Sequence, residues 1–313
     1  MSSKSITSSN APIPLIAWGL LGLLALVWGS SFILIKKSLL AYSVTEVAAG
    51  RVFLAFVFFF PVLVRSYKII PRFLLKYLFL SGLLGYLVPA FLIAEAGSHL
   101  NSALVGTLNA LSPLFTMLIG VLLFGQRSRL MQVVGLLVAL GGALMLILTH
   151  NGTSFSVINP YVILAIAATL CYGTNINIVA RYLRELPPLI STAWIFAGVG
   201  PMALGMLLYT GFFTKMSNPA NLVPSSALLS LGVLASGLMS VIFNRVIQLS
   251  SAVFAASVTY LMPIVALSWG LLDQESIGPQ QWGGTFVILA GVYLINRKAK
   301  SRPPSTPEPN HKP

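Results

Sequence analysis

The stretch SALVGTLNALSPLFTMLIGVLLFGQ (residues 102–126) recurs in the second half of the chain as SAVFAASVTYLMPIVALSWGLLDQE (residues 251–275). The residues before each copy also match, because Leu100-Asn101 corresponds to Leu249-Ser250 at an offset of 149 positions (249 minus 100). An earlier match pairs Trp28-Gly29-Ser30 with Tyr172-Gly173-Thr174 at an offset of 144 positions (172 minus 28). The chain is therefore an internal duplication.

Composition indicates a membrane protein. Hydrophobic residues make up 57% of the 313 residues, charged residues only 8%, and the mean hydropathy is +0.89, whereas soluble domains carry about 25% charged residues. The apolar segments have the length of membrane-spanning helices, about 20 residues. We predict ten spans, at residues 15–35, 45–64, 74–95, 102–124, 130–149, 160–180, 189–210, 226–246, 252–272 and 280–296.

Each repeat holds five of these spans. Because five is odd, the two copies must cross the membrane in opposite directions, which makes them inverted repeats. Inverted repeats place a substrate site near the bilayer midplane and allow one repeat to rock against the other. We therefore predict an all-α integral membrane protein with ten transmembrane helices, arranged as two inverted five-helix repeats.

The predicted organisation has three parts: a first repeat at residues 15–149, a second repeat at residues 160–296, and a disordered cytoplasmic tail at residues 297–313. The tail is rich in proline and charge, which is typical of disordered segments. The longest segment between spans, roughly 211–225, carries Lys215, Pro219 and Pro224 and is expected to be an exposed loop.

The distribution of Lys and Arg predicts the orientation. If the N-terminus is cytoplasmic, three basic residues lie outside (Lys36, Lys37 and Lys215) and Arg51 lies within a span. The other 15 of the 19 lie inside: Lys4, Arg65, Lys68, Arg72, Lys76, Arg127, Arg129, Arg181, Arg184, Arg245, Arg297, Lys298, Lys300, Arg302 and Lys312. This bias follows the positive-inside rule. It accounts for the net charge of +13 without nucleic acid, and predicts a multi-pass protein of the cytoplasmic membrane with both termini in the cytoplasm.

Several of these stretches resemble the EamA-type transporters of the drug/metabolite transporter superfamily. The resemblance rests on ALVWGSSFILIK (residues 25–36), on the two copies quoted above, and on the closing helices QVVGLLVALGGALML (132–146) and QWGGTFVILAGVYLI (281–295). The family pattern has a mid-span proline, supplied by Pro113 and Pro263, and a terminal Gly-Glu. Gln126 replaces that Glu in the first copy, and Glu275 follows Asp273-Gln274 rather than Gly in the second. The resemblance implies a ten-span transporter of small metabolites, amino acids or drugs.

Ionisable residues within spans are candidates for function because they are costly in the membrane. Arg51 lies about two turns into the second span and is a candidate to bind a substrate carboxylate through its planar guanidinium. The alternatives are a structural pair with Glu46 or Glu95, or snorkelling to the interface. Glu95 is a candidate proton carrier, and the proton a candidate coupling ion, if burial raises its pKa; the alternative is a simple acid at a loop edge.

Further substrate-binding candidates lie where the repeats correspond. Asn109 precedes Pro113 by four residues, and Tyr260 precedes Pro263 by three; each proline frees backbone groups near a polar side chain. The remaining candidates occupy matched places in the first and sixth spans: Trp28, Ser31, Tyr172 and Asn175. For all of these the alternative is helix–helix packing. Together they predict a pathway lined by the first, fourth, sixth and ninth spans.

No catalytic, phosphate-binding or metal-ligand pattern is present in the sequence, and we expect no cofactor and no enzyme activity. The single cysteine, Cys171, is expected to be a core residue. We predict a secondary transporter that exports small organic metabolites, amino acids or drugs by alternating access. A nucleotide-sugar or lipid-linked carrier and an integral-membrane enzyme are the alternatives. The substrate, the coupling ion and the oligomeric state stay open.

Overall fold

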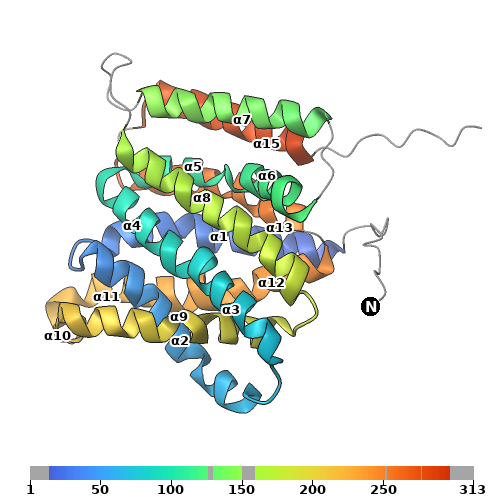
Figure 1. Ribbon diagram of the computed structural model, residues 1–313. Helices are drawn as coiled ribbons and strands as arrows, with labels where there is room; N and C mark the ends of the chain where they lie inside the picture. Colours follow the sequence, from blue (N-terminus) through green and yellow to red (C-terminus); the bar gives the residue numbers. More distant parts are fainter. Residues whose placement is uncertain (1–13, 126–129, 150–158, 251, 276, 297–313) are drawn as a thin grey trace, which may run out of the picture.

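The computed structural model describes residues 14–125, 130–149, 159–250, 252–275 and 277–296. Within these residues every regular element is helical, and the helices run broadly side by side along one direction (Figure 1). The predicted tail at residues 297–313 lies outside the described residues, as do Gln126 and Tyr260's side chain.

The ten predicted spans each correspond to one helix or to a run of consecutive helices. The first repeat contains α1 (Leu15–Ser38), α2 (Val44–Ser66), η1 (Arg72–Leu74) with α3 (Leu75–Gly82), η2 (Leu83–Leu87) and α4 (Val88–His99), then α5 (Ser102–Asn109) with α6 (Ser112–Phe124), and α7 (Leu130–Thr149). The second repeat contains α8 (Pro160–Ile178) with η3 (Val179–Leu183), α9 (Pro188–Thr210), α11 (Leu222–Ser230) with η5 (Leu231–Leu238) and α12 (Met239–Leu249), then α13 (Ala252–Ala256) with η6 (Ser257–Tyr260) and α14 (Met262–Leu272), and α15 (Pro279–Asn296).

Side-chain caps fix several helix starts. Ser43 forms a capping box at the start of α2, in which its hydroxyl accepts from the Glu46 amide and the Glu46 carboxylate accepts from the Ser43 amide. Asn101 caps α5 through the amide of Leu104. Polar residues between apolar runs therefore set where a span can begin, because they satisfy amides that have no partner within the helix.

Two equivalent spans are broken at their prolines, as the sequence predicted. α5 ends at Asn109 and α6 begins at Ser112, with Pro113 in its first turn. In the second repeat, α14 begins at Met262 with Pro263 in its first turn. A proline has no amide hydrogen and cannot continue the hydrogen bonding of the preceding turn, so the regular helix is interrupted within both spans.

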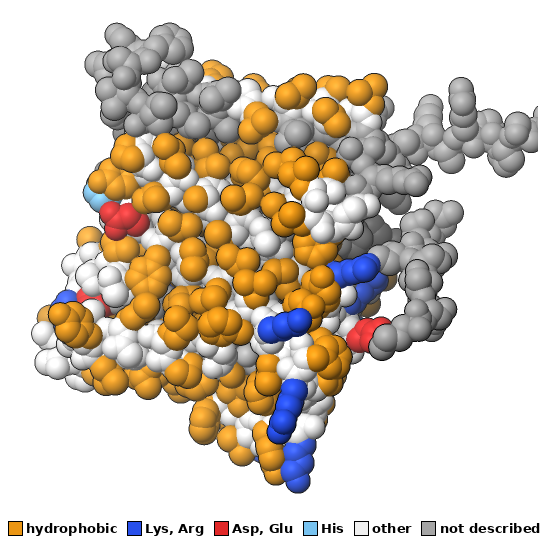
Figure 2. All heavy atoms as spheres, in the orientation of Figure 1, with side chains coloured by type: hydrophobic (Ala, Val, Ile, Leu, Met, Phe, Trp, Pro, Cys, Tyr) orange, Lys and Arg blue, Asp and Glu red, His pale blue; other side chains and the backbone are white. Residues whose placement is uncertain are grey.

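The outer surface fits a bilayer. Seven helical segments of the described residues are long and apolar enough to cross a membrane by length and composition; the other three predicted spans correspond to α7, to α13 through α14, and to α15. Figure 2 shows hydrophobic side chains over most of the visible face, with Lys and Arg gathered toward the end of the bundle where α1 begins. The protein is thus an all-α, multi-pass membrane protein.

The helices of the two repeats interleave. α7 packs along α15 at one side of the bundle and α2 packs along α9 (Figure 1). α1 contacts α12 and α14 of the second repeat, and α8 contacts α4 and α6 of the first. The two halves of the chain therefore do not form separate blocks, so a rocking motion has to move helices from both repeats together rather than one repeat against the other.

The segment between α9 and α11 is mostly exposed, as predicted, but it is helical rather than a loop. It contains the short helix α10 (Phe212–Met216) and the turn η4 (Pro219–Asn221), and α11 begins as early as Leu222. The cause is local: Gly211 ends α9 in the left-handed conformation with φ of 70°, and Phe212 then buries its whole side chain in the core. A buried aromatic residue anchors this segment to the bundle.

Candidate functional site

A cavity lies in the middle of the bundle, where the interrupted spans meet. The space open to the centre of a water-sized sphere is about 100 Å³, several times the volume that a single water needs. Its walls come from α1, α2, η2, α4, α5, α6, α8, η5, α12, α13, η6 and α14; α7, α9 and α15 contribute none of the described lining residues. Six of the seven predicted substrate-binding residues line it: Trp28, Ser31, Arg51, Asn109, Tyr172 and Asn175.

Arg51 supplies the charge of the cavity. It projects from α2, and its Nε donates to the hydroxyl of Ser236 on η5 at 2.9 Å. The guanidinium also lies within electrostatic reach of the phenol groups of Tyr172 and Tyr86. Among the described residues, no carboxylate forms an ion pair with Arg51. The ion pairs that the sequence suggested as alternatives, between Arg51 and Glu46 or Glu95, are therefore not formed in the structure.

The two glutamates lie next to other basic side chains. Glu46 is fully buried and its Oε2 lies 2.9 Å from Lys215 Nζ. Glu95 lies 3.8 Å from His99, and its side chain is 41% exposed. Glu95 is not among the described residues that line the cavity, so its role in proton coupling stays a prediction.

Trp28 joins the first and eighth spans at the cavity wall. Its indole Nε1 donates to the backbone carbonyl of Ala235 at 2.8 Å, and its ring lies 5.0 Å from that of Phe243. Ala235 lies in η5, a stretch of π-helix. Trp28 thus bonds the backbone of η5, whereas Arg51 bonds the side chain of Ser236 in the same stretch.

Asn175 of α8 is held against the third span. Its Oδ1 accepts from the Ser81 hydroxyl at 2.5 Å, and its amide lies directly over Gly85 of η2. A Cβ atom at position 85 would lie only 2.4 Å from Asn175 Nδ2. Gly85 is therefore required for this close approach, and it lines the cavity together with Asn175.

Asn109 lies at the break of the fourth span with an incomplete set of hydrogen bonds. Its Nδ2 lies 3.7 Å from the sulfur of Met262, a weak acceptor. Its Oδ1 is buried and has no partner among the described residues. A buried carbonyl oxygen without a donor is costly, so this oxygen has an unused capacity to accept a hydrogen bond.

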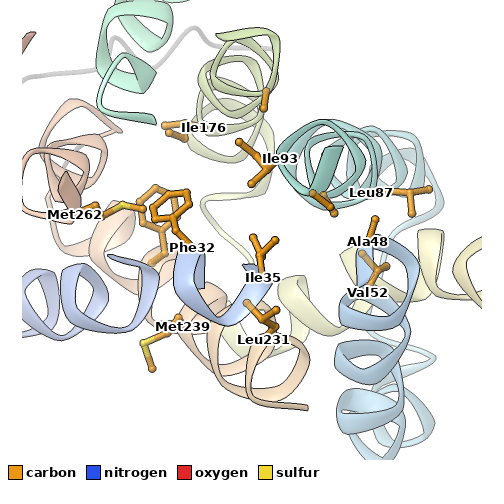
Figure 3. Close-up of a cluster of buried hydrophobic side chains, with 14 of the residues drawn as sticks. Phe32, Ile35, Ala48, Val52, Leu87, Ile93, Ile176, Leu231, Met239 and Met262 are labelled. Atoms are coloured by element: carbon orange, nitrogen blue, oxygen red, sulfur yellow. The ribbon is translucent and has the colours of Figure 1, made fainter. Parts of the chain in front are cut away.

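Apolar side chains form the rest of the wall. Figure 3 shows Phe32 of α1 between Met262 and Ile176, and Ile35 facing Ile93 of α4. These residues come from four different spans, two of each repeat, so helices of both repeats meet at the cavity. The site combines one cation, several neutral hydrogen-bonding groups and an apolar wall, the usual composition of a small-molecule site.

Five polar lining residues were not among the sequence candidates; two of them, Ser112 and Thr259, lie at the breaks of the fourth and ninth spans, and the other three are Tyr86, Ser236 and Ser240. These three belong to the third and eighth spans, at or next to π-helical stretches that are equivalent in the repeat, since Leu83–Leu87 and Leu231–Leu238 begin 148 positions apart (231 minus 83). The sign of these residues in the sequence was a glycine that stands at a comparable place in each of the two spans. π-Helical turns occur often at functional sites.

Comparison with known proteins agrees with this architecture. A profile of the EamA-like transporter family matches residues 16–148 and again residues 159–297. The chain is 27% identical over 299 residues to the "Uncharacterized inner membrane transporter YedA" of Escherichia coli K12, covering 89% of this chain and 90% of that protein. It is 27% identical over 281 residues to a "Probable amino-acid metabolite efflux pump" of Salmonella typhimurium, covering 87% and 92%.

Solved structures share the fold, as the following example shows. It superposes with a TM-score of 0.64 over 90% of this chain and 96% of that chain, at 16% sequence identity. At this identity the likeness concerns the fold alone.

Proposed function

Since this chain belongs to the EamA-like transporter family, we propose that it exports a small organic metabolite by secondary transport, and that a carboxylate of this metabolite binds Arg51. The protein is a membrane transporter; its substrate, direction and coupling are the proposed parts. One relative whose name states a substrate class is the efflux pump that is named for amino-acid metabolites.

The observation that carries the proposal is the guanidinium of Arg51 inside the cavity without a carboxylate partner. One of its N–H groups donates to Ser236. A positive charge in a membrane-spanning bundle is costly unless it is paired. A substrate carboxylate supplies this pairing and can accept two parallel hydrogen bonds from the planar guanidinium. The cavity is thereby electrostatically suited to an anion or a zwitterion.

The other lining residues narrow the range of substrates that the cavity can bind. Trp28, Tyr86 and Tyr172 offer aromatic faces with polar edges, and Asn109 offers an unpartnered carbonyl oxygen. A small metabolite with one acidic group, a donor group and a modest apolar part matches these features. A nucleotide sugar has two phosphates and would require several cations, whereas Arg51 is the single cation among the described lining residues.

The arrangement of the helices supports alternating access. The cavity lies at the broken middle of two equivalent spans and beside two equivalent π-helical stretches. Irregular backbone lining a central cavity is typical of transporters built from inverted repeats. We propose that these interruptions allow the ends of the spans to move while the middle keeps the substrate, with both termini in the cytoplasm.

The test is an efflux assay on cells that express the protein. Cells are loaded with a panel of labelled amino acids and N-acetyl amino acids, together with their uncharged amides, and the loss of label is measured against cells with an empty vector. We expect efflux of at least one carboxylate and not of its amide. Equal efflux of an acid and its amide would show that Arg51 does not select a carboxylate, and efflux of none beyond the vector control would contradict the substrate class.

A further inference from the structure

A second, smaller hollow continues from the central cavity toward the end of the bundle at which α1 finishes. It lies between α1, α4 and α5, and the two hollows share three wall residues: Phe32, Ile35 and Ile93. Its far wall includes Lys36, Gly97 and Ser102. A solute that leaves the cavity in this direction therefore meets Lys36 and Ser102 last.

The same two residues belong to a cluster of ion pairs that closes this end. Lys36 Nζ lies 2.6 Å from Asp273 Oδ2 and 2.8 Å from Glu275 Oε1. Lys37 Nζ lies 2.5 Å from Asp273 Oδ1. Both carboxylates follow the end of α14, so the cluster ties the last turn of α1 to the turn between α14 and α15.

Glu275 extends this tie to a third element. The amide and the hydroxyl of Ser102 donate to Glu275 Oε1 at 3.2 and 2.9 Å, at the first turn of α5, where a negative charge is favoured. The Glu275 side chain is only 3% exposed, whereas that of Lys36 is 40% exposed. One buried carboxylate thus connects both residues at the far wall of the hollow.

We propose that Glu275 is the latch of a gate: its carboxylate holds α1 against α5 and closes the passage from the central cavity at this end. Opening then requires Glu275 to leave Lys36 and Ser102, so that α1 and α5 can separate. This proposal concerns the path and not the substrate, and it holds for any solute that enters the cavity.

The charges of the latch persist at neutral pH. Burial alone would raise the pKa of Glu275, but the hydrogen bonds from Lys36 and Ser102 outweigh burial and place the pKa below its usual value of 4.5. The pKa of Asp273 is also lowered, mainly by the hydrogen bonds from Lys36 and Lys37. A lowered carboxyl pKa means that the ion pairs are present above the usual value and are lost only as the pH falls through the lowered one.

The neighbouring helices add no charge that would change this. α5, α14 and α15 carry no charged residue in their sequences, and the titratable side chains of α4, Glu95 and His99, lie 3.8 Å from each other. The closed latch is therefore not opened by a proton near neutral pH; it opens when the helices move.

The sequence does not repeat the carboxylate of the latch in the first repeat, because the position equivalent to Glu275 is Gln126, which is uncharged and lies outside the described residues. Opening at the latched end has to separate charged groups, whereas no ion pair among the described residues joins the helices at the other end. The test below therefore compares access to the cavity from the two ends.

The test measures access to the cavity and needs no substrate, so that it can fail or succeed independently of the proposed transport. Ser31→Cys, on a Cys171→Ala background, places one thiol on the cavity side of the latch. Vesicles of each orientation are treated with a membrane-impermeant thiol reagent, and the labelling rate is compared with and without Glu275→Gln. The control is Glu46→Gln, because Glu46 pairs with Lys215 at the same end but does not line the passage.

We expect Glu275→Gln to raise labelling from the Lys36 end by about tenfold, the effect of losing one charge-assisted hydrogen bond that exists only in the closed state. Labelling from the opposite end, and labelling of the Glu46→Gln control, should not rise. If Glu275→Gln does not fold, Ser102→Ala removes one donor and keeps every charge, and a smaller rise from the same end is expected. Unchanged labelling in the folded variant, or an equal rise with Glu46→Gln, would overturn the proposal.

Discussion

Replacing Gly85 by alanine tests whether Asn175 is held in the cavity wall by the close contact described above. The added Cβ would lie 2.4 Å from Asn175 Nδ2 and 2.7 Å from its Cγ, so the amide has to rotate away. Rotation breaks the hydrogen bond from Ser81, which measures 2.5 Å. The substitution therefore changes the shape of the cavity as well as the packing of the third span on the sixth.

The size of the effect follows from three contributions. Overfilling a packed site costs about 1–3 kcal/mol, and the lost hydrogen bond costs about 1 kcal/mol. Alanine is favoured over glycine within a helix by about 1 kcal/mol, which offsets the second contribution. We expect Gly85→Ala to destabilise the folded protein by about 1–3 kcal/mol.

The assay is thermal unfolding of the purified protein in detergent, with Gly205→Ala as the matched control. Gly205 lies in α9, and an added Cβ there would have no heavy atom within 4 Å, so the control should be unchanged or slightly stabilised. Gly85→Ala should unfold a few degrees below the wild type and should bind the transported carboxylate more weakly. If both variants unfold alike and bind alike, the contact between Gly85 and Asn175 does not shape the site.

Three further predictions concern topology, the pathway and pH. Reporter fusions after Lys76 should show cytoplasm and fusions after Lys215 the exterior; the reverse pattern would overturn the orientation. A cysteine placed at Asn109, on a Cys171→Ala background, should react with small water-soluble thiol reagents and be protected by a transported solute, and inertness from both sides would place it in packed helix. Because the pKa of Glu275 is lowered, access from the latched end should be constant from neutral pH downward and rise only below the usual value of 4.5; a rise near pH 6 would contradict the ion pairing.

The repeat made the fold predictable. The spans follow from apolar length, and the breaks of α5–α6 and α13–α14 follow from Pro113 and Pro263, because a missing amide hydrogen has a local consequence. Comparison of equivalent spans also led to Trp28 and Asn175, which line one cavity in the structure. The local effect of proline and the correspondence between the repeats therefore predicted the spans, their breaks and these two lining residues.

Contacts between distant segments were not predictable in this way. The sequence does not show that Arg51 meets Ser236, 185 positions away, or that Lys36 meets Glu275, 239 positions away. The π-helical stretches were missed because a wider turn changes which residues face inward without a marked change of composition. The interleaving of the repeats also depends on helix packing, which periodicity along one helix does not reveal.

The most direct test of the central claim is the binding of a transported carboxylate to the Arg51→Gln variant. Glutamine keeps an amide donor for Ser236 but removes the charge, so that a charge-assisted interaction of about 1.5–3 kcal/mol is lost, equivalent to a roughly 10- to 150-fold increase in Kd. Arg245→Gln is the control, because Arg245 is exposed near the end of α12 and bonds only Gln248 among the described residues. We predict weaker binding and slower efflux for Arg51→Gln with unchanged thermal unfolding, and wild-type behaviour for the control; wild-type affinity in Arg51→Gln would contradict the account.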